Sequence, residues 1–501
     1  GETVALLGPN SPFYVATTLG VTQLGAVTAL INTHLTGAPL AHALREARCR
    51  LVLVHRRHEE AVRALGLEGV ELLVYGPGPF DEESARPGAP LAPVKVESGS
   101  DFVYIYTSGT TGLPKPCRVT HGRAVVAGSM FAAAVWRFEP GDKVYCVLPL
   151  YHSSGLLLGV GAAIMGGAAV ALRESFSARA FWSDAVRYQA TGMLYIGEIC
   201  RHLLATAPGP DDRAHRLRVA VGNGMRTDVW EPFARRFGVP QIREFYAATE
   251  APGGIFNFTG RVGSVGHLPL RHLLPGRLAR YDLTTGEHVR DARGRCLDCA
   301  PNEEGELLVR ISEKPLISGL EFKGYTDEAA TRKKILTDVF RPGDRYYRSG
   351  DLMRVDEDGF FYFVDRLGDT FRWKGENVST EQVAQVLLGV AEVAFAVVYG
   401  VPLAGREGRA GMAAIELRPG AAFDGAAVFA AVEAHLPSPA RPRFVRLVAH
   451  IELNASFKPV RAALREQGAD PSTLTDPLFV YDESARTYSP LTTQVWSALS
   501  L

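Results

Sequence analysis

The sequence has no net charge and few cysteines, and each of these shortages excludes a class of protein. Lysine plus arginine and aspartate plus glutamate both number 54 in 501 residues. A chain without a basic excess gives no electrostatic reason to expect nucleic acid as its main partner. Six cysteines are too few for a disulfide framework. Cys296 and Cys299 form a Cys-x-x-Cys pair with no second pair nearby, so we interpret them as loop thiols in a reducing compartment rather than zinc ligands.

Charge is also missing from one long stretch, residues 144–172, which contains no Asp, Glu, Lys or Arg. The stretch is long enough to raise the question of a membrane span. Its five glycines and its strand-like start favour a buried α/β core instead. The chain itself opens at Gly1 on a strand-like run, so we expect an incomplete N-terminus and leave a signal or membrane anchor upstream as an open alternative.

Short apolar strands alternate with helical patterns up to about residue 250. The strand-like segments are residues 4–7, 51–54, 72–75, 103–106, 144–148, 193–196, 218–221 and 242–246. Helical patterns, such as those at residues 178–189 and 229–237, lie between several of them. The alternation predicts an α/β fold with mixed, mostly parallel sheets flanked by helices.

The pattern changes twice further along the chain. Glycine-punctuated polar strands predict a β-rich subdomain at about residues 277–364. After residue 365 the sequence predicts helices at 380–388, 426–435 and 460–466 and strands at 394–399, 412–417 and 444–448. We therefore predict an N-terminal domain at residues 1–366, which includes the β-rich subdomain, and a small α+β C-terminal domain at residues 367–501, joined by a hinge.

A loop rich in glycine and hydroxyl side chains follows the apolar strand that ends at Tyr106. Phosphate-binding loops need hydroxyl donors, free backbone N–H groups and a cation. The loop supplies all three through Thr107, Ser108, Gly109, Thr110, Thr111, Gly112 and Lys115. It is not a Walker loop, because no Gly-Lys-Ser/Thr ends it. Its composition alone is equally typical of a solvated hairpin.

The full string Tyr-Thr-Ser-Gly-Thr-Thr-Gly-Leu-Pro-Lys at residues 106–115 resembles the signature of the adenylate-forming superfamily, which contains acyl-CoA synthetases. Later segments resemble further elements of that family in the same order, at residues 245–250, 347–351 and 365–379. The last of these, with residues 195–198 and 407–412, is most similar to the fatty acid transport protein branch, also called very-long-chain acyl-CoA synthetases. The resemblance spans nearly the whole chain.

The resemblance implies ATP, Mg²⁺ and coenzyme A as ligands and assigns nucleotide-binding roles. Glu250 is expected to hold the metal, which prefers carboxylate and phosphate oxygens, and Thr249 to donate to the α-phosphate in catalysis. Asp351 suits both ribose hydroxyls, because a carboxylate accepts two O–H donors at once. The resemblance also implies that the nucleotide contacts Gly222, Asn223, Tyr246 and Arg366. Without the motifs around them, the same residues have ordinary interpretations. A Thr-Glu pair after a strand is typical of a helix cap, and Ser-Gly-Asp is typical of a turn.

The C-terminal part holds the implied catalytic lysine and hinge. Lys458 matches the mobile lysine that bridges carboxylate and phosphate in family members, although the Thr-Gly usual before it is Asn454-Ala455 here. A solvated surface lysine is the alternative. Gly368 occupies the hinge position, where glycine can absorb a large change in backbone angles. Gly375 is expected to line the pantetheine tunnel.

The uncharged stretch is expected to bind the acyl chain. His152 opens the glycine-rich part of this stretch and either contacts the substrate or has a structural role. Small residues such as Gly155 and Gly159 are expected to leave room for a lipid chain. An amino-acid substrate would need a buried acid near its ammonium group, and the stretch has none.

We therefore predict a long- or very-long-chain fatty acid–CoA ligase that is cytoplasmic and acts through an acyl-adenylate. Two alternatives stay open. One is a ligase for a bile-acid-like, aromatic or shorter carboxylate, and the other is a membrane-associated fatty acid uptake or binding protein. Peripheral association with a membrane is compatible with each of these.

Overall fold

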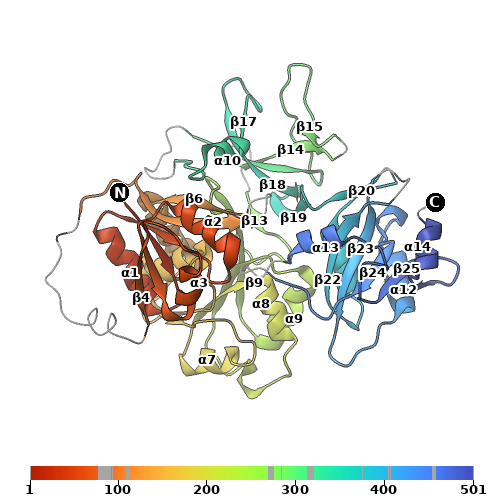
Figure 1. The fold of residues 1–501 in the computed structure, drawn as a ribbon, viewed down its shortest axis with the longest axis horizontal. Helices are drawn as coiled ribbons and strands as arrows, with labels where there is room; N and C mark the ends of the chain where they lie inside the picture. Colours follow the sequence, from red (N-terminus) through yellow and green to blue (C-terminus); the bar gives the residue numbers. More distant parts are fainter. Residues whose placement is uncertain are drawn as a thin grey trace. The chain divides into compact units, whose positions relative to one another are not determined.

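The computed structural model forms two compact units (Figure 1). The described residues are 2–76, 92, 94–108, 113–268, 276–283, 285–312, 321–374, 376–403, 406, 408–453 and 459–499. The first unit comprises Gly1–Gly276 and Leu308–Ser349, and the second comprises Arg277–Leu307 and Gly350–Leu501. The domain boundary expected between residues 366 and 367 does not coincide with this division and stays a prediction.

The first sheet of the first unit has the strand order β4-β3-β1-β2-β5-β6. Its strands are β1 (Thr3–Leu7), β2 (Val27–Leu30), β3 (Leu51–His55), β4 (Glu71–Tyr75), β5 (Asp101–Ser108) and β6 (Pro114–Thr120). Neighbours pair in parallel except β5 and β6, which are antiparallel. Helix α2 (Gly37–Ala47) buries Leu40 and Leu44 in a cluster with Ala5 and Val52. Strands covered in this way need continuous apolar runs, as their sequences show.

The second sheet of this unit has the order β12-β11-β10-β9-β7-β8. Its strands are β7 (Lys143–Cys146), β8 (Ala169–Leu172), β9 (Gly192–Ile196), β10 (Val219–Asn223), β11 (Gln241–Ala247) and β12 (Gly254–Asn257), and only β12 is antiparallel to its neighbour. The α/β fold with mostly parallel sheets is therefore confirmed. The helical pattern at residues 229–237 becomes α9 (Thr227–Phe237), and the one at 178–189 becomes the shorter α7 (Phe181–Arg187).

The uncharged stretch at residues 144–172 contributes to this second sheet. It runs through β7, the π-helix η3 (Ser154–Gly161), α6 (Ala162–Gly166) and β8. Strands β7 and β8 are parallel neighbours, so the stretch forms one strand–helix–strand crossover. The stretch is thus part of an α/β sheet layer, as expected; residues 144–163 are mostly buried, while residues 164–167 are exposed. Among the described residues, none of the helices has the length and apolar character needed to cross a membrane.

The predicted β-rich stretch contains β14 (Gly276–Asp282), β15 (Glu287–His288), β16 (Glu304–Arg310), β17 (Ile335–Thr337), β18 (Arg345–Val355) and β19 (Phe360–Arg366). Residues beyond 366 in the second unit form the sheet β22-β23-β24-β25-β26, drawn in blue in Figure 1. Its strands are β22 (Val393–Val401), β23 (Ala410–Leu417), β24 (Phe444–Leu447), β25 (Leu478–Asp482) and β26 (Thr487–Pro490). The helices of this region are α11 (Thr380–Leu388), α12 (Gly425–His435), α13 (Arg461–Gln467) and α14 (Thr493–Leu499). Val383, Val398 and Val432 are among the residues that form its core.

Candidate active site

Several predicted site residues lie at one edge of the second sheet of the first unit. Strands β7, β9, β10 and β11 are parallel, so the segments that follow them all leave the sheet at their carboxyl ends. His152 follows β7, Asn223 ends β10, and Thr249 and Glu250 follow β11. A direct contact joins two of these segments, because the hydroxyls of Ser153 and Thr249 lie 3.1 Å apart. The carboxyl edge of such a sheet is the usual place for a ligand site in α/β proteins.

The Glu250 carboxylate is held by two tyrosines from a later part of the chain. Tyr325 donates its hydroxyl to Oε1 at 2.7 Å, and Tyr347 donates to the same oxygen at 3.1 Å. Glu250 is 8% exposed, and both tyrosines are buried. Burial and the nearby Glu250 carboxylate raise the pKa of both hydroxyls, which therefore stay protonated donors. Among the described residues, both hydrogen bonds to this carboxylate go to Oε1.

The turn that carries Thr249 and Glu250 is fixed by a half-buried arginine. Arg123, on α5 (His121–Met130), donates to the carbonyl oxygen of Ala251 and, at 3.5 Å, to that of Ala248. Burial lowers the pKa of its guanidinium. The sequence analysis missed Arg123, which lies more than a hundred residues before the turn and belongs to no motif.

The predicted adenine-side segment, Gly222 and Asn223, ends strand β10. A Cβ atom at Gly222 would lie 2.3 Å from the carbonyl oxygen of Tyr195, on the neighbouring strand. The chain therefore needs glycine there for close strand packing. The next turn is equally tight, since a Cβ atom at Gly197 would lie 1.8 Å from the carbonyl oxygen of Gly224.

A buried carboxyl group that the sequence analysis missed holds this turn in place. Glu244, on β11, accepts hydrogen bonds from the backbone N–H groups of Gly224 (3.0 Å) and Met225 (2.9 Å) and from the Tyr195 hydroxyl (2.7 Å). Burial raises the pKa of Glu244 to about 8, although the three hydrogen bonds act to lower it. The signal in the sequence was an acid within an apolar strand, two residues before Tyr246.

We expect Glu244→Gln to flatten the pH dependence of stability between about pH 5 and 8. The folded-state pKa of about 8 exceeds the value of about 4.3 for an unfolded glutamate. The contribution of Glu244 is therefore complete below the unfolded pKa and is lost as the pH rises through the folded pKa. Urea unfolding at about pH 6 and about pH 9 should show a larger loss of unfolding free energy for the wild type than for Glu244→Gln. Equal losses would contradict the assignment.

The structure describes the residues on both sides of the predicted phosphate loop. Thr107 lies opposite Lys115 in the antiparallel β5–β6 pair, and Ser108 lies opposite Pro114. The flanks therefore form a hairpin that brings a hydroxyl and an ammonium group to the base of the loop. Gly109, Thr110, Thr111 and Gly112 lie outside the described residues.

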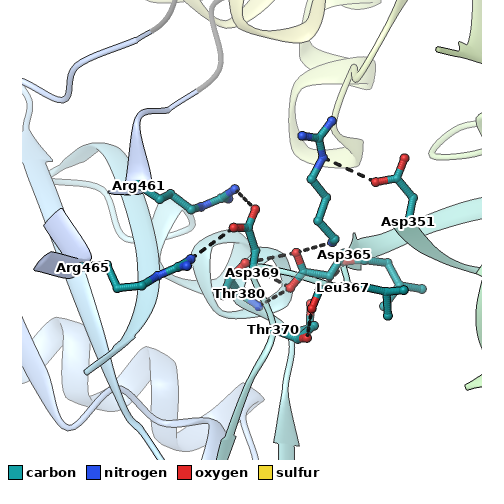
Figure 2. Close-up of polar contacts among 11 residues, drawn as sticks. Asp351, Asp365, Leu367, Asp369, Thr370, Thr380, Arg461 and Arg465 are labelled. Carbon is teal, nitrogen blue, oxygen red and sulfur yellow. Dashed lines mark hydrogen bonds and ion pairs between the residues drawn. The ribbon is translucent and has the colours of Figure 1, made fainter. Parts of the chain in front are cut away.

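The second unit brings together Asp351 and Arg366. They are directly opposite each other in the β18–β19 pair, and Nε of Arg366 lies 3.4 Å from Oδ1 of Asp351 (Figure 2). Asp351 is buried, while Arg366 is half-exposed. Glu306 supports the turn before Asp351 by accepting a hydrogen bond from the N–H of Gly350 at 3.0 Å. A carboxylate and a guanidinium side by side on a strand pair can bind hydroxyl groups and an anion together.

The segment around the predicted hinge is anchored at both ends. Asp365 is buried and accepts hydrogen bonds from the backbone N–H (2.6 Å) and the hydroxyl of Thr380 (Figure 2). Burial raises the pKa of Asp365. A Cβ atom at Gly368 would meet nothing within 4 Å, so the conformation does not itself require glycine there. The hinge role of Gly368 stays a prediction, and Gly375 and Lys458 lie outside the described residues.

The predicted acyl site does not have the open space expected at its glycines. A Cβ atom at Gly155 would lie 2.3 Å from the carbonyl oxygen of Pro149, and one at Gly159 would lie 3.2 Å from Leu194. A side chain at either position would therefore meet protein atoms, and the role of these glycines in an acyl site stays a prediction. They permit close packing of η3, whose π-helical form is common at functional sites. The His152 ring contacts that of Tyr151 with centroids 4.8 Å apart.

Comparison with known proteins places this geometry in a family. Residues 1–314 match the AMP-binding enzyme family, and residues 382–458 match the AMP-binding enzyme C-terminal domain. Long-chain fatty acid transport protein 3 from Homo sapiens is 40% identical over all of this chain and 75% of its own length. Long-chain fatty acid transport protein 1 from Mus musculus is 41% identical over 99% of this chain and 79% of its own length.

Solved structures share the fold at lower identity. ATP-bound MatB from Rhodopseudomonas palustris has a TM-score of 0.78 at 22% identity, covering 93% of this chain and 88% of that one. O-succinylbenzoate coenzyme A synthetase from Bacillus subtilis, solved with ATP and a magnesium ion, has a TM-score of 0.72 at 22% identity over 94% of this chain and 90% of that one. The chain belongs to the AMP-binding enzyme family, in the branch that contains the long-chain fatty acid transport proteins.

Proposed function

We propose that this protein is an ATP-dependent ligase that joins a long- or very-long-chain fatty acid to coenzyme A. The observation that carries the proposal is the arrangement of Glu250. A buried carboxylate lies at the carboxyl edge of a parallel sheet, beside Thr249 in the sequence, and one of its oxygens accepts hydrogen bonds from two tyrosines. This arrangement suits a cation that is shared with a polyphosphate.

The proposed reaction has two halves. A carboxylate first attacks the α-phosphorus of ATP and releases pyrophosphate, and a thiol then attacks the acyl-adenylate and releases AMP. The first half brings an anion to a polyanion, so fixed cations and hydrogen-bond donors must offset the charge that develops. Lys115, Thr249 and Arg366 are proposed to supply such groups. Lys458 is proposed to bridge the two reacting anions.

Mg²⁺ fits the donor set around Glu250. No group of three or more His, Cys, Asp or Glu side chains suited to a metal occurs within the described part of the chain. A single carboxylate is nevertheless sufficient, because Mg²⁺ often takes one or two carboxylates together with substrate phosphates and water. When bound, the ion would neutralise phosphate charge, while Tyr325 and Tyr347 hold Oε1 of Glu250 fixed.

Coenzyme A is the proposed thiol substrate, and the second unit offers a place for its anionic groups. A cavity of about 380 Å³ lies beside Asp369. Arg372, Arg409 and Arg465 are among the residues that line it. Guanidinium groups are suited to phosphate recognition.

The fatty acid assignment rests on two supports. The curated relatives at about 40% identity are named long-chain fatty acid transport proteins. The segment after His152 has no charged side chain until Arg173, so it offers no counter-ion for an amino acid. An aromatic carboxylate is the competing substrate class, since an anthranilate CoA ligase shares the fold with a TM-score of 0.78.

A comparison of carboxylate substrates tests the proposal. The protein is incubated with ATP, Mg²⁺ and coenzyme A together with palmitate, a longer fatty acid, benzoate or cholate, and AMP release is measured. We expect the highest kcat/KM with the long fatty acids. A preference for benzoate or cholate would replace the substrate assignment. Fatty acid binding without AMP release from any carboxylate would favour the uptake or binding protein instead.

A further inference from the structure

Strand β16 carries a fully buried carboxyl group in an apolar setting. Glu306 is 0% exposed, and Leu307 and Leu308, which follow it, are buried as well. Placing an ionised carboxylate in such surroundings costs free energy unless polar partners compensate for the lost water. The partners of Glu306 therefore indicate why this strand has an acid at the position.

One carboxylate oxygen of Glu306 lies beside a histidine from the edge strand β15. Nε2 of His288 is 2.8 Å from Oε2 of Glu306, and the two side chains are 5% and 0% exposed. This distance is that of an ion pair when the imidazole is protonated. The His288 ring also packs edge-on against Tyr281, with ring centroids 5.1 Å apart. His288 therefore limits the rotation of the Glu306 carboxylate.

The other oxygen of Glu306 holds the backbone just before Asp351. Oε1 accepts the N–H of Gly350 at 3.0 Å, and the carbonyl oxygen of Gly350 accepts the N–H of Leu367 at 2.9 Å. Gly350 has a φ of 76°, in the left-handed region. Glycine reaches many backbone conformations at little cost, so external hydrogen bonds are needed to select this one. Glu306 thus fixes one of the two peptide groups that lead into Asp351, and Leu367 fixes the other.

The Asp351 carboxylate depends on this backbone for its place beside Arg366. Asp351 is buried and lies directly opposite Arg366 in the β18–β19 pair, with 3.4 Å between Oδ1 and Nε (Figure 2). Because an aspartate side chain is short and has few rotamers, its carboxylate moves with its own backbone. A change in the conformation of Gly350 would therefore displace the carboxylate that is proposed to bind the ribose.

We propose that Glu306 and His288 are positioning residues that hold the carboxylate of Asp351 in place for the ribose hydroxyls of ATP. The proposal rests on the proposed function, in which Asp351 binds the ribose. It adds a role in specificity, because the two residues act through Asp351 to set how strongly the protein prefers a nucleotide that carries these hydroxyls. His288, Glu306, Gly350 and Asp351 all belong to the second unit.

The test compares ATP with 2′,3′-dideoxy-ATP, which lacks both hydroxyl donors. In pyrophosphate release with saturating palmitate, the wild type should prefer ATP by about 10²-fold or more in kcat/KM, since each hydrogen bond to a charged group contributes about tenfold or more. Glu306→Leu removes the acceptor for Gly350 and should reduce this preference about tenfold. Glu306→Gln, whose amide oxygen can still accept the N–H, should retain most of it.

Two features of the test separate positioning from stability. The preference is a ratio of two rates, so a smaller folded fraction lowers both rates and leaves the ratio unchanged. The double variant His288→Leu/Glu306→Leu replaces both members of a buried pair by apolar residues, which often preserves stability. It still lacks the acceptor for Gly350, so its preference for ATP should fall as it does in Glu306→Leu.

Glu416→Leu is the matched control. Glu416 also accepts a backbone N–H, that of Ile451 at 2.8 Å, and also lies beside a histidine, with 3.3 Å to Nδ1 of His450, in the same unit. It has no contact with Gly350 or Asp351 among the interactions of the described residues, so the control should keep the wild-type preference for ATP.

Asp351→Asn shows whether Glu306 acts through the carboxylate, because Glu306→Leu should change the preference no further in that background. An unchanged preference in both leucine variants, or equal losses in Glu306→Leu and Glu416→Leu, would overturn the positioning role. A wild type that uses both nucleotides equally well would remove Asp351 from the ribose site, and the proposal with it. If the wild type releases no pyrophosphate with any carboxylate, the proposed function fails. Dissociation constants of the two nucleotides, measured by calorimetry, then report the preference instead.

Discussion

Replacing Glu250 with glutamine should reduce pyrophosphate release about 10²- to 10³-fold, as expected when one charged group that acts on the transition state is lost. The amide keeps the size of the side chain and can still accept hydrogen bonds from Tyr325 and Tyr347, which donate to one oxygen at 2.7 and 3.1 Å. What it loses is the negative charge on the other oxygen. The variant should therefore remain folded and require much more Mg²⁺ for half-maximal rate.

Two measurements separate this metal role from a structural one. The Mg²⁺ dependence of pyrophosphate release should shift to higher concentration in Glu250→Gln, while the thermal midpoint without ligands should change little. Asp184→Asn is the matched control, because Asp184 also accepts a tyrosine hydroxyl, that of Tyr145 at 2.9 Å, in the same unit. An unchanged Mg²⁺ dependence in Glu250→Gln, or an equal shift in the control, would remove Glu250 from the metal site.

The sequence predicts well those features that short segments encode. Apolar runs between helical patterns identify most strands of the parallel sheets, and strand ends then indicate where Asn223, Thr249 and Glu250 gather. The residues that hold these side chains in place are harder to predict, because they lie far away in the sequence. Tyr325 and Arg123 contact the Glu250 turn from 75 and 125 or more residues away. Neither position shows a local pattern, so only the folded chain reveals these contacts.

Glycine is the residue type whose role is hardest to predict from sequence. The glycines after His152 looked like space for a lipid chain, yet a Cβ atom at Gly155 would collide with the carbonyl oxygen of Pro149. A glycine in the sequence is compatible both with an empty pocket and with close backbone packing. Only the positions of the neighbouring atoms in the structure distinguish the two. At Gly222 the same reasoning explains why the strand end can pack against Tyr195.

Replacing Lys458 with alanine should lower the rate of adenylate formation by about 10²-fold or more, because the fixed cation between the two reacting anions is removed. Thioester formation from preformed acyl-adenylate should stay within about threefold of the wild type, since that half-reaction brings no second anion to the phosphate. Single-turnover measurements of pyrophosphate release and of thioester formation check this difference. Lys333→Ala, which removes an exposed ammonium group from α10 (Glu328–Lys333), should leave both rates unchanged.

The same pair of measurements decides what the altered sequence before Lys458 means. Asn454 and Ala455 stand where the branch usually has Thr-Gly, so the segment has lost a hydroxyl and a flexible residue. If Lys458→Ala affects both half-reactions equally, the lysine has no selective role in adenylation. If adenylation alone falls, Lys458 acts as the bridging cation despite its changed neighbours.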